Sequence, residues 1–331
     1  MRKGIIGIAI ALVVSMGVTS GSALAADKII MNIATGTAPD HPENVGANRF
    51  KELVEKKSNG RVEVVVHPAG QLGSQRDFVE ALRSGTLEIT MVTIGFFSSY
   101  DPLLNIFELP YLFRDRDHAY RVVDGPIGVQ IKDRVDKKGV HVLTFWEAGL
   151  RYITNNVRPI YKPDDLKGLK IRVPESKVSI DGFKAFGANA APLAFTELYM
   201  ALKQGVFDGQ ENPPSNIYHS KLYEAQKYLS LTGHQFLVHM FMYSGQLWDK
   251  LPADIKQIVQ ESAVEAGKFQ RNYAWQEDTK LVGALKDAGM QVNDEVDKQA
   301  FIDKAKPLYA EYGKLYGNDA IKFIEQIQAT K

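Results

Sequence analysis

Apolar and polar positions along the chain alternate between the two periods that distinguish strands from helices. Continuous or alternating apolar residues are typical of strands, and apolar residues three or four positions apart are typical of helices. The predicted strands are 28–34, 61–67, 87–94, 140–146, 169–173, 206–210 and 236–243, and the predicted helices between them include 44–57, 75–84, 180–186 and 196–204. This alternation predicts an α/β fold with mainly parallel sheets.

The longest helical pattern covers 252–288. Pro252 suits the first position of a helix, and Gly289 suits its end. A helix of this length would reach about 55 Å, which is longer than a single lobe. Because its apolar positions lack the strict heptad of a coiled coil, we expect a helix that spans two lobes of one molecule.

The N-terminus has the pattern of an export signal. Arg2 and Lys3 precede an apolar run over 5–18, and Ala23-Leu24-Ala25 forms a small-x-small cleavage site. The run is shorter than the roughly 20 residues that span a bilayer, which argues against the alternative of a permanent anchor. We predict that residues 1–25 are a signal peptide and that the mature chain begins at Ala26.

The mature chain is long enough for two lobes. Its roughly 306 residues exceed the size at which a single core stops growing. Turns and prolines begin near 147–151, where we place the first crossing between lobes, and 236–243 returns to the first lobe. The predicted lobes are therefore 26–148 with about 236–275, and about 149–235 with 276–331.

Composition limits the compartment and the partners. The sequence contains no cysteine, so the fold cannot depend on disulfides and the cleavage site cannot carry a lipid. The whole chain has 40 basic and 39 acidic residues, of which the signal contributes two basic ones, so the mature net charge is about −1. This balance gives no basis for nucleic acid or a membrane surface as partner.

Motifs of catalysis are missing from the sequence. It has no Gly-x-Ser-x-Gly elbow, no His-Glu-x-x-His, no glycine loop for phosphates and no cysteine nucleophile. His234 and His239 flank an apolar strand, which is typical of structural histidines. Glu147, Asp208 and Glu211 lie near the predicted crevice and leave an acid–base pair as the alternative. We expect a protein that is not an enzyme and holds no metal or other cofactor.

Two arginines near the predicted crossing indicate a binding site. Arg172 alternates with Ile171 and Val173 near the C-terminal end of a strand, where ligands bind in open α/β sheets. A guanidinium in an apolar strand is costly unless an anion meets it, and no nearby acidic residue is an obvious partner. Arg151 follows the strand 140–146. Together they favour a small carboxylate ligand. The alternatives are that Arg172 caps a helix or pairs with a distant acid, and that Arg151 is solvated.

Three motifs resemble those of a known family. They are Arg151-x-x-Thr-Asn155, Asp-Leu-Lys-Gly-Leu-Lys-Ile-Arg-Val-Pro at 165–174, and Asp-Gly-Gln-Glu-Asn-Pro at 208–213. With them, nearly the whole mature chain resembles the solute-binding proteins of tripartite ATP-independent periplasmic (TRAP) transporters. The resemblance implies a two-lobed protein that closes over its ligand about a hinge, with a long helix across both lobes. It also implies a periplasmic location and delivery to TRAP membrane subunits, and we expect a monomer.

The resemblance assigns roles to four residues of the site. Arg172 matches the arginine that holds the ligand carboxylate through two parallel hydrogen bonds, and Asn212 matches an amide contact to the same group. Phe195 matches an aromatic residue that packs over the ligand. Arg151 matches a frequent second basic contact.

The wall from the first lobe is predicted from the residues alone. We expect His41, Thr93, Trp146 and Glu147 there, although a core position suits Trp146 equally. The carboxylate of Glu147 would repel a second acidic group and accept hydrogen bonds from hydroxyls, which favours a hydroxylated acid such as a hexuronate or an aldonate. A C4-dicarboxylate or another monocarboxylate stays open because Arg151 could balance a second charge. The sequence also leaves open an enzyme that acts on a sugar acid and a binding protein that is coupled to a sensor.

Overall fold

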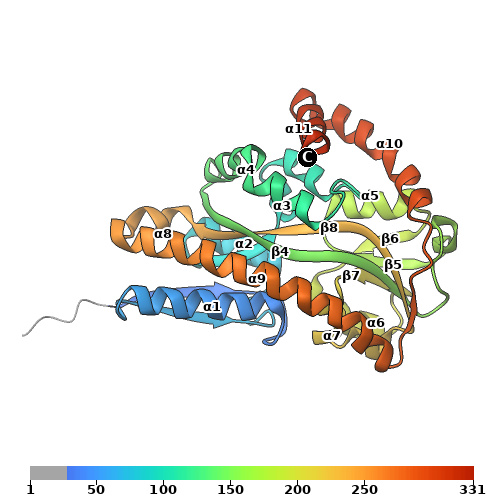
Figure 1. Cartoon of the computed structure of the whole chain (residues 1–331), viewed down its shortest axis with the longest axis horizontal. Coiled ribbons are helices and arrows are strands. Elements are labelled where there is room, and N and C mark those ends of the chain that lie inside the picture. The colour runs from blue at the N-terminus through green and yellow to red at the C-terminus, as the bar shows by residue number, and fades with distance from the viewer. Residues whose placement is uncertain (1–27) are drawn as a thin grey trace, which may run out of the picture.

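The computed structural model describes residues 28–331 (Figure 1). The predicted signal peptide, 1–25, lies outside the described residues. Between residues 28 and 331, no helix combines the length and the apolar character that crossing a bilayer requires.

Within the described residues the strands form one mixed sheet of nine, in the order β2-β1-β3-β8-β4-β7-β5-β6, with β9 paired to β8. The strands are β1 (Ile29–Ala34), β2 (Val62–His67), β3 (Ile89–Thr93), β4 (Val140–Asn155), β5 (Lys170–Val173), β6 (Asn189–Pro192), β7 (Gly209–Asn212), β8 (Tyr228–Ser244) and β9 (Gln291–Asn293). The outer strands pair in parallel, but β8 is antiparallel to β3 and β4, and β4 is antiparallel to β7. The prediction of mainly parallel sheets is therefore wrong for the centre of the sheet.

The two central strands connect the lobes. β4 and β8 pair from Val140 with Ser244 at one end to Asn155 with Tyr228 at the other. The sequence predicted only their apolar halves, because the other halves contain polar and glycine positions that break the alternation. The register shifts between Glu147 and Gly149, so a bulge lies where the strand passes from one lobe to the other.

Helices cover both lobes of this α/β fold. They are α1 (Pro42–Lys57), α2 (Gln75–Ser84), α3 (Arg116–Asp124), α4 (Pro126–Asp136), α5 (Lys177–Ala185), α6 (Leu198–Lys203), α7 (Pro214–His219), α8 (Gly245–Lys250), α9 (Ala253–Asp287), α10 (Lys298–Tyr316) and α11 (Asn318–Ala329). Short 3₁₀ helices are η1 (Ile94–Ser99), η2 (Pro102–Glu108), η3 (Pro163–Leu166), η4 (Phe195–Glu197) and η5 (Leu222–Ala225).

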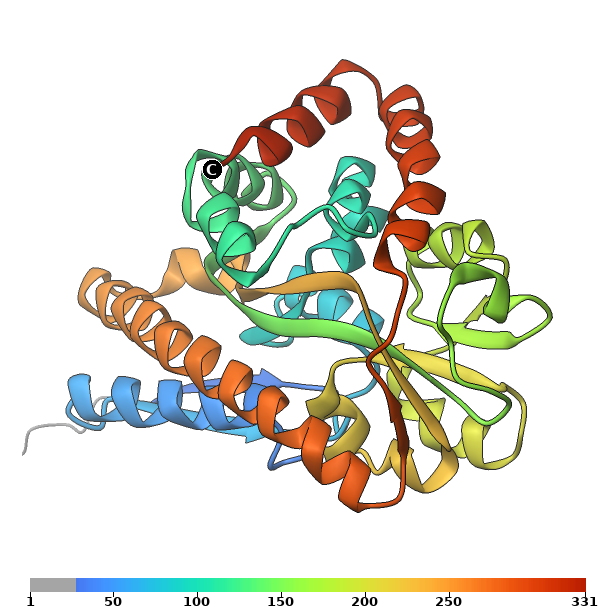
Figure 2. The ribbon, with the colours of Figure 1, turned by 45° about the vertical axis from the view of Figure 1, so that its right-hand side comes forward.

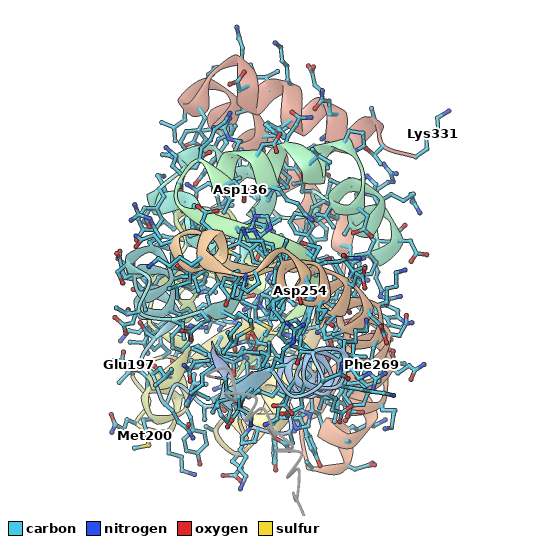
Figure 3. The ribbon with its side chains drawn as sticks, turned by 90° about the vertical axis from the view of Figure 1, so that its left-hand side faces the viewer. Asp136, Glu197, Met200, Asp254, Phe269 and Lys331 are labelled. Atoms are coloured by element: carbon cyan, nitrogen blue, oxygen red, sulfur yellow. The ribbon has the colours of Figure 1, made fainter. Side chains whose placement is uncertain are left out.

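The long helix lies across both lobes, as predicted (Figure 2). Ile255 and Val259 of α9 pack in the core of the first lobe with β1, β3 and α1. Leu285, near the other end, packs with α6 and η5 in the second lobe. Phe269, on the outer side of α9, is 41% exposed (Figure 3). One continuous helix thus contributes apolar contacts to two separate cores.

The C-terminal helix departs from the predicted lobe boundaries. Residues 276–331 were expected in the second lobe, but α11 packs against α4 and η2. Its apolar face, with Phe323, Ile324 and Ile327, joins the cluster that also contains Leu104 and Ile131 of the first lobe. The chain therefore crosses between the lobes once more after α9, because α10 links the second lobe to the first.

Candidate functional site

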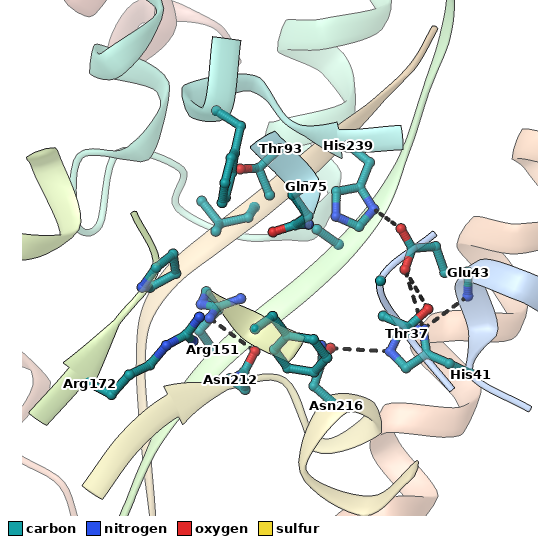
Figure 4. Close-up of a pocket in the computed structure, with 16 residues that line it drawn as sticks. Thr37, His41, Glu43, Gln75, Thr93, Arg151, Arg172, Asn212, Asn216 and His239 are labelled. Carbon is teal, nitrogen blue, oxygen red and sulfur yellow. Dashed lines mark hydrogen bonds and ion pairs between the residues drawn. The ribbon is translucent and has the colours of Figure 1, made fainter. Parts of the chain in front are cut away.

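A cavity lies between the lobes, where atoms leave about 540 Å³ unfilled, including space that is open to solvent (Figure 4). The second lobe and the crossing strand β4 contribute Arg151, Arg172, Pro174, Phe195, Asn212 and Asn216. The first lobe contributes Gly36, Thr37, His41, Glu43, Gln75, Thr93, Phe96 and His239, and Ala148 and Leu237 lie where the lobes meet. Six of the eight predicted site residues line this cavity, and they are Arg172, Asn212, Arg151, Phe195, Thr93 and His41.

Arg172, on β5, is only 1% exposed. Its Nε and Nη2 atoms donate to the carbonyl oxygen of Leu193 at 2.9 and 2.6 Å, while Nη1 is buried with no hydrogen-bond partner among residues 28–331. Burial lowers the pKa of Arg172 to about 9, partly opposed by the charge of Glu211, so the side chain stays cationic at neutral pH. A buried cation with free N–H groups is costly unless an anion meets it, so this wall of the cavity is chemically suited to an anion.

Arg151 differs from Arg172 because it already has an acid partner. Its Nε bonds Oε2 of Glu211, and its Nη2 donates to Oε1 of Glu211 at 2.8 Å and to Oδ1 of Asn212 at 3.0 Å. Burial alone would raise the pKa of Glu211, but the charge of Arg151 and the hydrogen bonds from Arg151 and His234 lower it to about 2. The expectation that no acid lies near the arginines is therefore wrong for Arg151, whose charge is neutralised inside the protein.

β-sheet pairing brings these groups together. Antiparallel pairing of β4 with β7 places Tyr152 opposite Asn212, and parallel pairing of β7 with β5 places Arg172 opposite Gln210. The Nδ2 atom of Asn212 donates to Oε1 of Gln210, which fixes the amide with its oxygen toward Arg151. Three neighbouring strands therefore hold the polar wall of the second lobe on rigid backbone.

The opposite wall is a hydrogen-bonded cluster around α1. Thr37 donates to Oε2 of Glu43 at 2.6 Å, and Oε1 of Glu43 lies 3.7 Å from Nδ1 of His239 (Figure 4). Nε2 of His41 lies 3.1 Å from Oδ1 of Asn216, so this contact joins the two lobes. Burial lowers the pKa of His41 and of His239 to about 3 and raises that of Glu43 to about 7.

Comparison with known proteins decides the family. The chain matches the bacterial extracellular solute-binding proteins of family 7 over residues 33–315. It belongs to this family.

Solved relatives share the fold over nearly their whole length. A TRAP periplasmic solute-binding protein from Polaromonas sp. JS666, bound to D-erythronate, is 36% identical with a TM-score of 0.88, over 92% of this chain and 99% of the other. The sugar acid binding protein DctPAm from Advenella mimigardefordensis, in complex with galactonate, is 33% identical with a TM-score of 0.89, over 92% and 99%. A TRAP periplasmic solute-binding protein from Sulfurospirillum deleyianum, with bound succinate, is 34% identical with a TM-score of 0.87, over 92% and 100%.

These matches confirm the predicted family. The chain is a solute-binding protein of the TRAP type with the two-lobed α/β fold of its relatives. Family 7 consists of extracellular solute-binding proteins that serve transport and are not enzymes.

Two predicted residues of the family 7 protein lie outside the cavity. Trp146 is fully buried in the first-lobe core, where it stacks on Phe241 with ring centroids 4.3 Å apart. Oε2 of Glu147 accepts hydrogen bonds from Nε of Arg116 at 2.9 Å and from the hydroxyl of Tyr120. The expectation that Trp146 and Glu147 form a wall of the site is wrong because their side chains point to the α9 and α3 sides of the strand.

The three carboxylates of the alternative acid–base pair are not arranged to act on a ligand in the cavity. Glu147 is held by Arg116, Glu211 is held by Arg151, and Oδ2 of Asp208 accepts from the backbone nitrogen of Lys170 at 2.7 Å. None of the three carboxylates lines the cavity. Within residues 28–331, no three histidine or acidic side chains are grouped so that they could hold a metal ion.

Sequence reasoning missed several polar residues of the first-lobe wall. Glu43 lies in the first turn of a helix, where an acidic residue is ordinary, and Thr37 lies in a turn. His239 was predicted to be a structural histidine but lines the cavity, whereas His234 is structural and lies 3.2 Å from Oε2 of Glu211. No signal in the sequence distinguishes Glu43 from other first-turn acids, because its position depends on how α1 packs against β8.

Proposed function

We propose that this protein captures a small hydroxylated monocarboxylate, such as a hexuronate or an aldonate, and delivers it to the membrane subunits of a TRAP transporter. The relatives bound to D-erythronate and galactonate support this class of ligand. The protein acts in the periplasm, after removal of residues 1–25, as a monomer. It binds its ligand without a cofactor, releases it unchanged and has no role with nucleic acid.

The free Nη1 atom of Arg172 is the observation that carries the proposal. Arg172 is buried, its Nη1 atom has no hydrogen-bond partner among residues 28–331, and Arg151 is already neutralised by Glu211. Among these residues, the second-lobe wall thus offers one uncompensated positive charge, which suits one carboxylate. The planar guanidinium matches a carboxylate in shape, and a lysine would supply only a point charge.

The remaining contacts follow from the same arrangement. Asn212 and Arg151 border the carboxylate site, and Phe195 provides an apolar surface over the ligand. Thr93 and His41 approach from the first lobe. Bending of β4 and β8 would move the first lobe relative to the second, which would admit the ligand and then enclose it.

Contacts at the rim of the cavity support closure about these strands. His219 of the second lobe lies 2.9 Å from Asp40 of the first, and Arg76 of the first lobe lies 3.1 Å from Glu175 of the second. The contact of Arg76 with Glu175 is a partly exposed ion pair, and such pairs contribute about 0–1 kcal/mol. The rim therefore adds little to closure compared with a ligand that occupies both walls.

Titration calorimetry tests the proposal. Purified protein of residues 26–331 is first screened by thermal shift against hexuronates, aldonates and dicarboxylates, since a ligand at 100 times its Kd stabilises the fold by about 2.7 kcal/mol. Ligands that raise the melting temperature are then titrated and recovered for mass spectrometry. We expect one hydroxylated monocarboxylate to bind with a micromolar or lower Kd and to be recovered intact. Absence of binding by every acid, or conversion of the bound acid, would contradict the proposal.

A further inference from the structure

Glu43 is an acidic group in the cavity wall that faces the arginines. It is 2% exposed, and Thr37 donates to its Oε2 at 2.6 Å. Its Oε1 accepts no hydrogen bond from the described part of the chain and lies 3.7 Å from Nδ1 of His239. That Nδ1 atom is itself buried without a hydrogen-bond partner among residues 28–331. Glu43 therefore keeps acceptor capacity directed at the space between the lobes.

The charges around the cavity are unevenly distributed. The charged residues that line it are Arg151, Arg172 and Glu43. Because Glu211 neutralises Arg151, the described residues present a ligand with one free cation on the second-lobe wall and one acidic group on the first-lobe wall. A carboxylate at Arg172 is attracted, whereas a second carboxylate at the other end of the ligand would meet Glu43 in a site of low dielectric.

We propose that Glu43, held by Thr37 and backed by His239, determines the specificity of the site by accepting a hydrogen bond from a ligand hydroxyl and excluding a second carboxylate. This inference rests on the proposed function and narrows it. A hydroxyl can donate to a carboxylate, but an ionised carboxylate has no proton to donate. The site then prefers an acid with a hydroxyl-bearing end over the same acid with two carboxylate ends.

Protonation of Glu43 should weaken this exclusion. Burial raises the pKa of Glu43 to about 7, so the carboxyl is charged above that pH and able to donate below it. The titratable and charged groups around it are His41 and Asp40 at the start of α1, His239 on β8, His219 on α7 and Arg151 on β4. Burial holds the pKa of His41 and of His239 at about 3, so both stay neutral over this pH range.

Matched ligand pairs test the inference. An aldonate and its aldarate differ only in that a terminal hydroxymethyl group is replaced by a carboxylate. Three such pairs are D-erythronate with meso-tartrate, D-galactonate with galactarate, and D-gluconate with D-glucarate. For the pair whose aldonate binds, we expect the wild-type protein at pH about 8 to prefer the aldonate about 100-fold, because juxtaposed like charges are strongly unfavourable.

Glu43→Gln keeps the shape of the side chain and removes its charge. We expect it to reduce the aldonate preference to about tenfold or less, since the amide can donate to a second carboxylate. Glu88→Gln is the matched control, because Glu88 accepts from the backbone and side-chain nitrogens of Asn32 at 2.8 and 2.9 Å in the same lobe, outside the cavity. The control should leave the preference unchanged.

Wild-type protein gives a second measurement that needs no variant. Its preference for the aldonate should fall as the pH is lowered from about 8 to about 6, while the aldarate, with ordinary carboxyl pKa values near 4, stays ionised. An unchanged ratio in Glu43→Gln, or a wild-type ratio that does not vary with pH, would overturn the inference. Wild-type protein that binds no acid at all would instead contradict the proposed function.

Discussion

Replacement of Arg172 by alanine separates a ligand contact from a structural role. The side chain is buried, and its only hydrogen bonds within residues 28–331 are the two to the carbonyl oxygen of Leu193. Removing one partner of a buried charge pair costs about 3–5 kcal/mol, which corresponds to a loss of about 160- to 4,600-fold in affinity. A micromolar Kd would therefore rise to about 0.1 mM or beyond.

The same substitution should change the stability of the ligand-free protein much less. Loss of both donors to Leu193 costs about 1–3 kcal/mol, but removing a buried guanidinium with an unsatisfied Nη1 relieves a desolvation cost of similar size. We expect nearly unchanged unfolding of ligand-free Arg172→Ala and no thermal shift on adding the acid that stabilises the wild type. Arg172→Lys keeps the charge without the planar fork, so its affinity should lie between the two.

Arg158→Ala is the matched control for Arg172→Ala. Arg158 also donates to backbone carbonyl oxygens, those of Asp165 and Lys167, both at 2.7 Å, in the same lobe but outside the cavity. It should lower stability without changing the Kd measured by calorimetry. Equal affinities of wild type and Arg172→Ala would refute the reasoning, and so would a loss of affinity that Arg158→Ala reproduces.

Three further predictions concern the core, the crossing strand and pH. Trp146→Phe should lower the free energy of unfolding by about 1–3 kcal/mol in denaturant titrations and leave the Kd unchanged, because Trp146 packs in the core. A large loss of affinity would instead indicate that Trp146 contacts the ligand. Gly149→Ala should destabilise the protein by about 1–3 kcal/mol more than Gly289→Ala. Both glycines have φ above 100°, but only at Gly149 would a Cβ lie 2.9 Å from the side chain of Pro213. Equal losses of stability in the two variants would show that the clash with Pro213 contributes nothing. Because burial raises the pKa of Glu43 from 4.5 to about 7, the folded protein keeps a proton there that the unfolded chain releases, so the contribution of Glu43 to stability should fall as pH rises from about 4.5 to about 7. Thermal unfolding of wild type and Glu43→Gln across this range isolates that contribution, because both proteins share the other titrating groups, and parallel pH profiles would contradict the raised pKa.

The sequence was sufficient for the elements that have strong local signals. Pro252 and Gly289 bracketed α9 to within a residue or two, because both ends of a helix have characteristic residues. Arg172 was singled out because an arginine in an apolar strand is costly without an anion, and no neighbouring residue in the sequence supplies one. Such signals depend on neighbouring residues in the sequence, so they can be recognised without knowing how the chain packs.

Other features depend on contacts that the sequence does not reveal. The bulge between Glu147 and Gly149 breaks the two-residue alternation of β4, so Ala148 lines the cavity in place of Glu147. The pairing of Arg151 with Glu211 arises from β4 lying beside β7, sixty residues apart in the chain. The placement of α11 on the first lobe likewise depends on where α10 directs the chain.

The division of charge between the walls also links ligand capture to closure. In this arrangement of the lobes Arg172 is almost completely buried, and its Nη1 has no acceptor among residues 28–331. An uncompensated buried cation is costly, so an anion that meets Arg172 would stabilise this arrangement of the lobes. A ligand shifts such an equilibrium only by its difference in affinity for the two arrangements. In the proposed function the carboxylate supplies that difference at the second-lobe wall, and by the proposed role of Glu43 the first-lobe wall then selects among carboxylates.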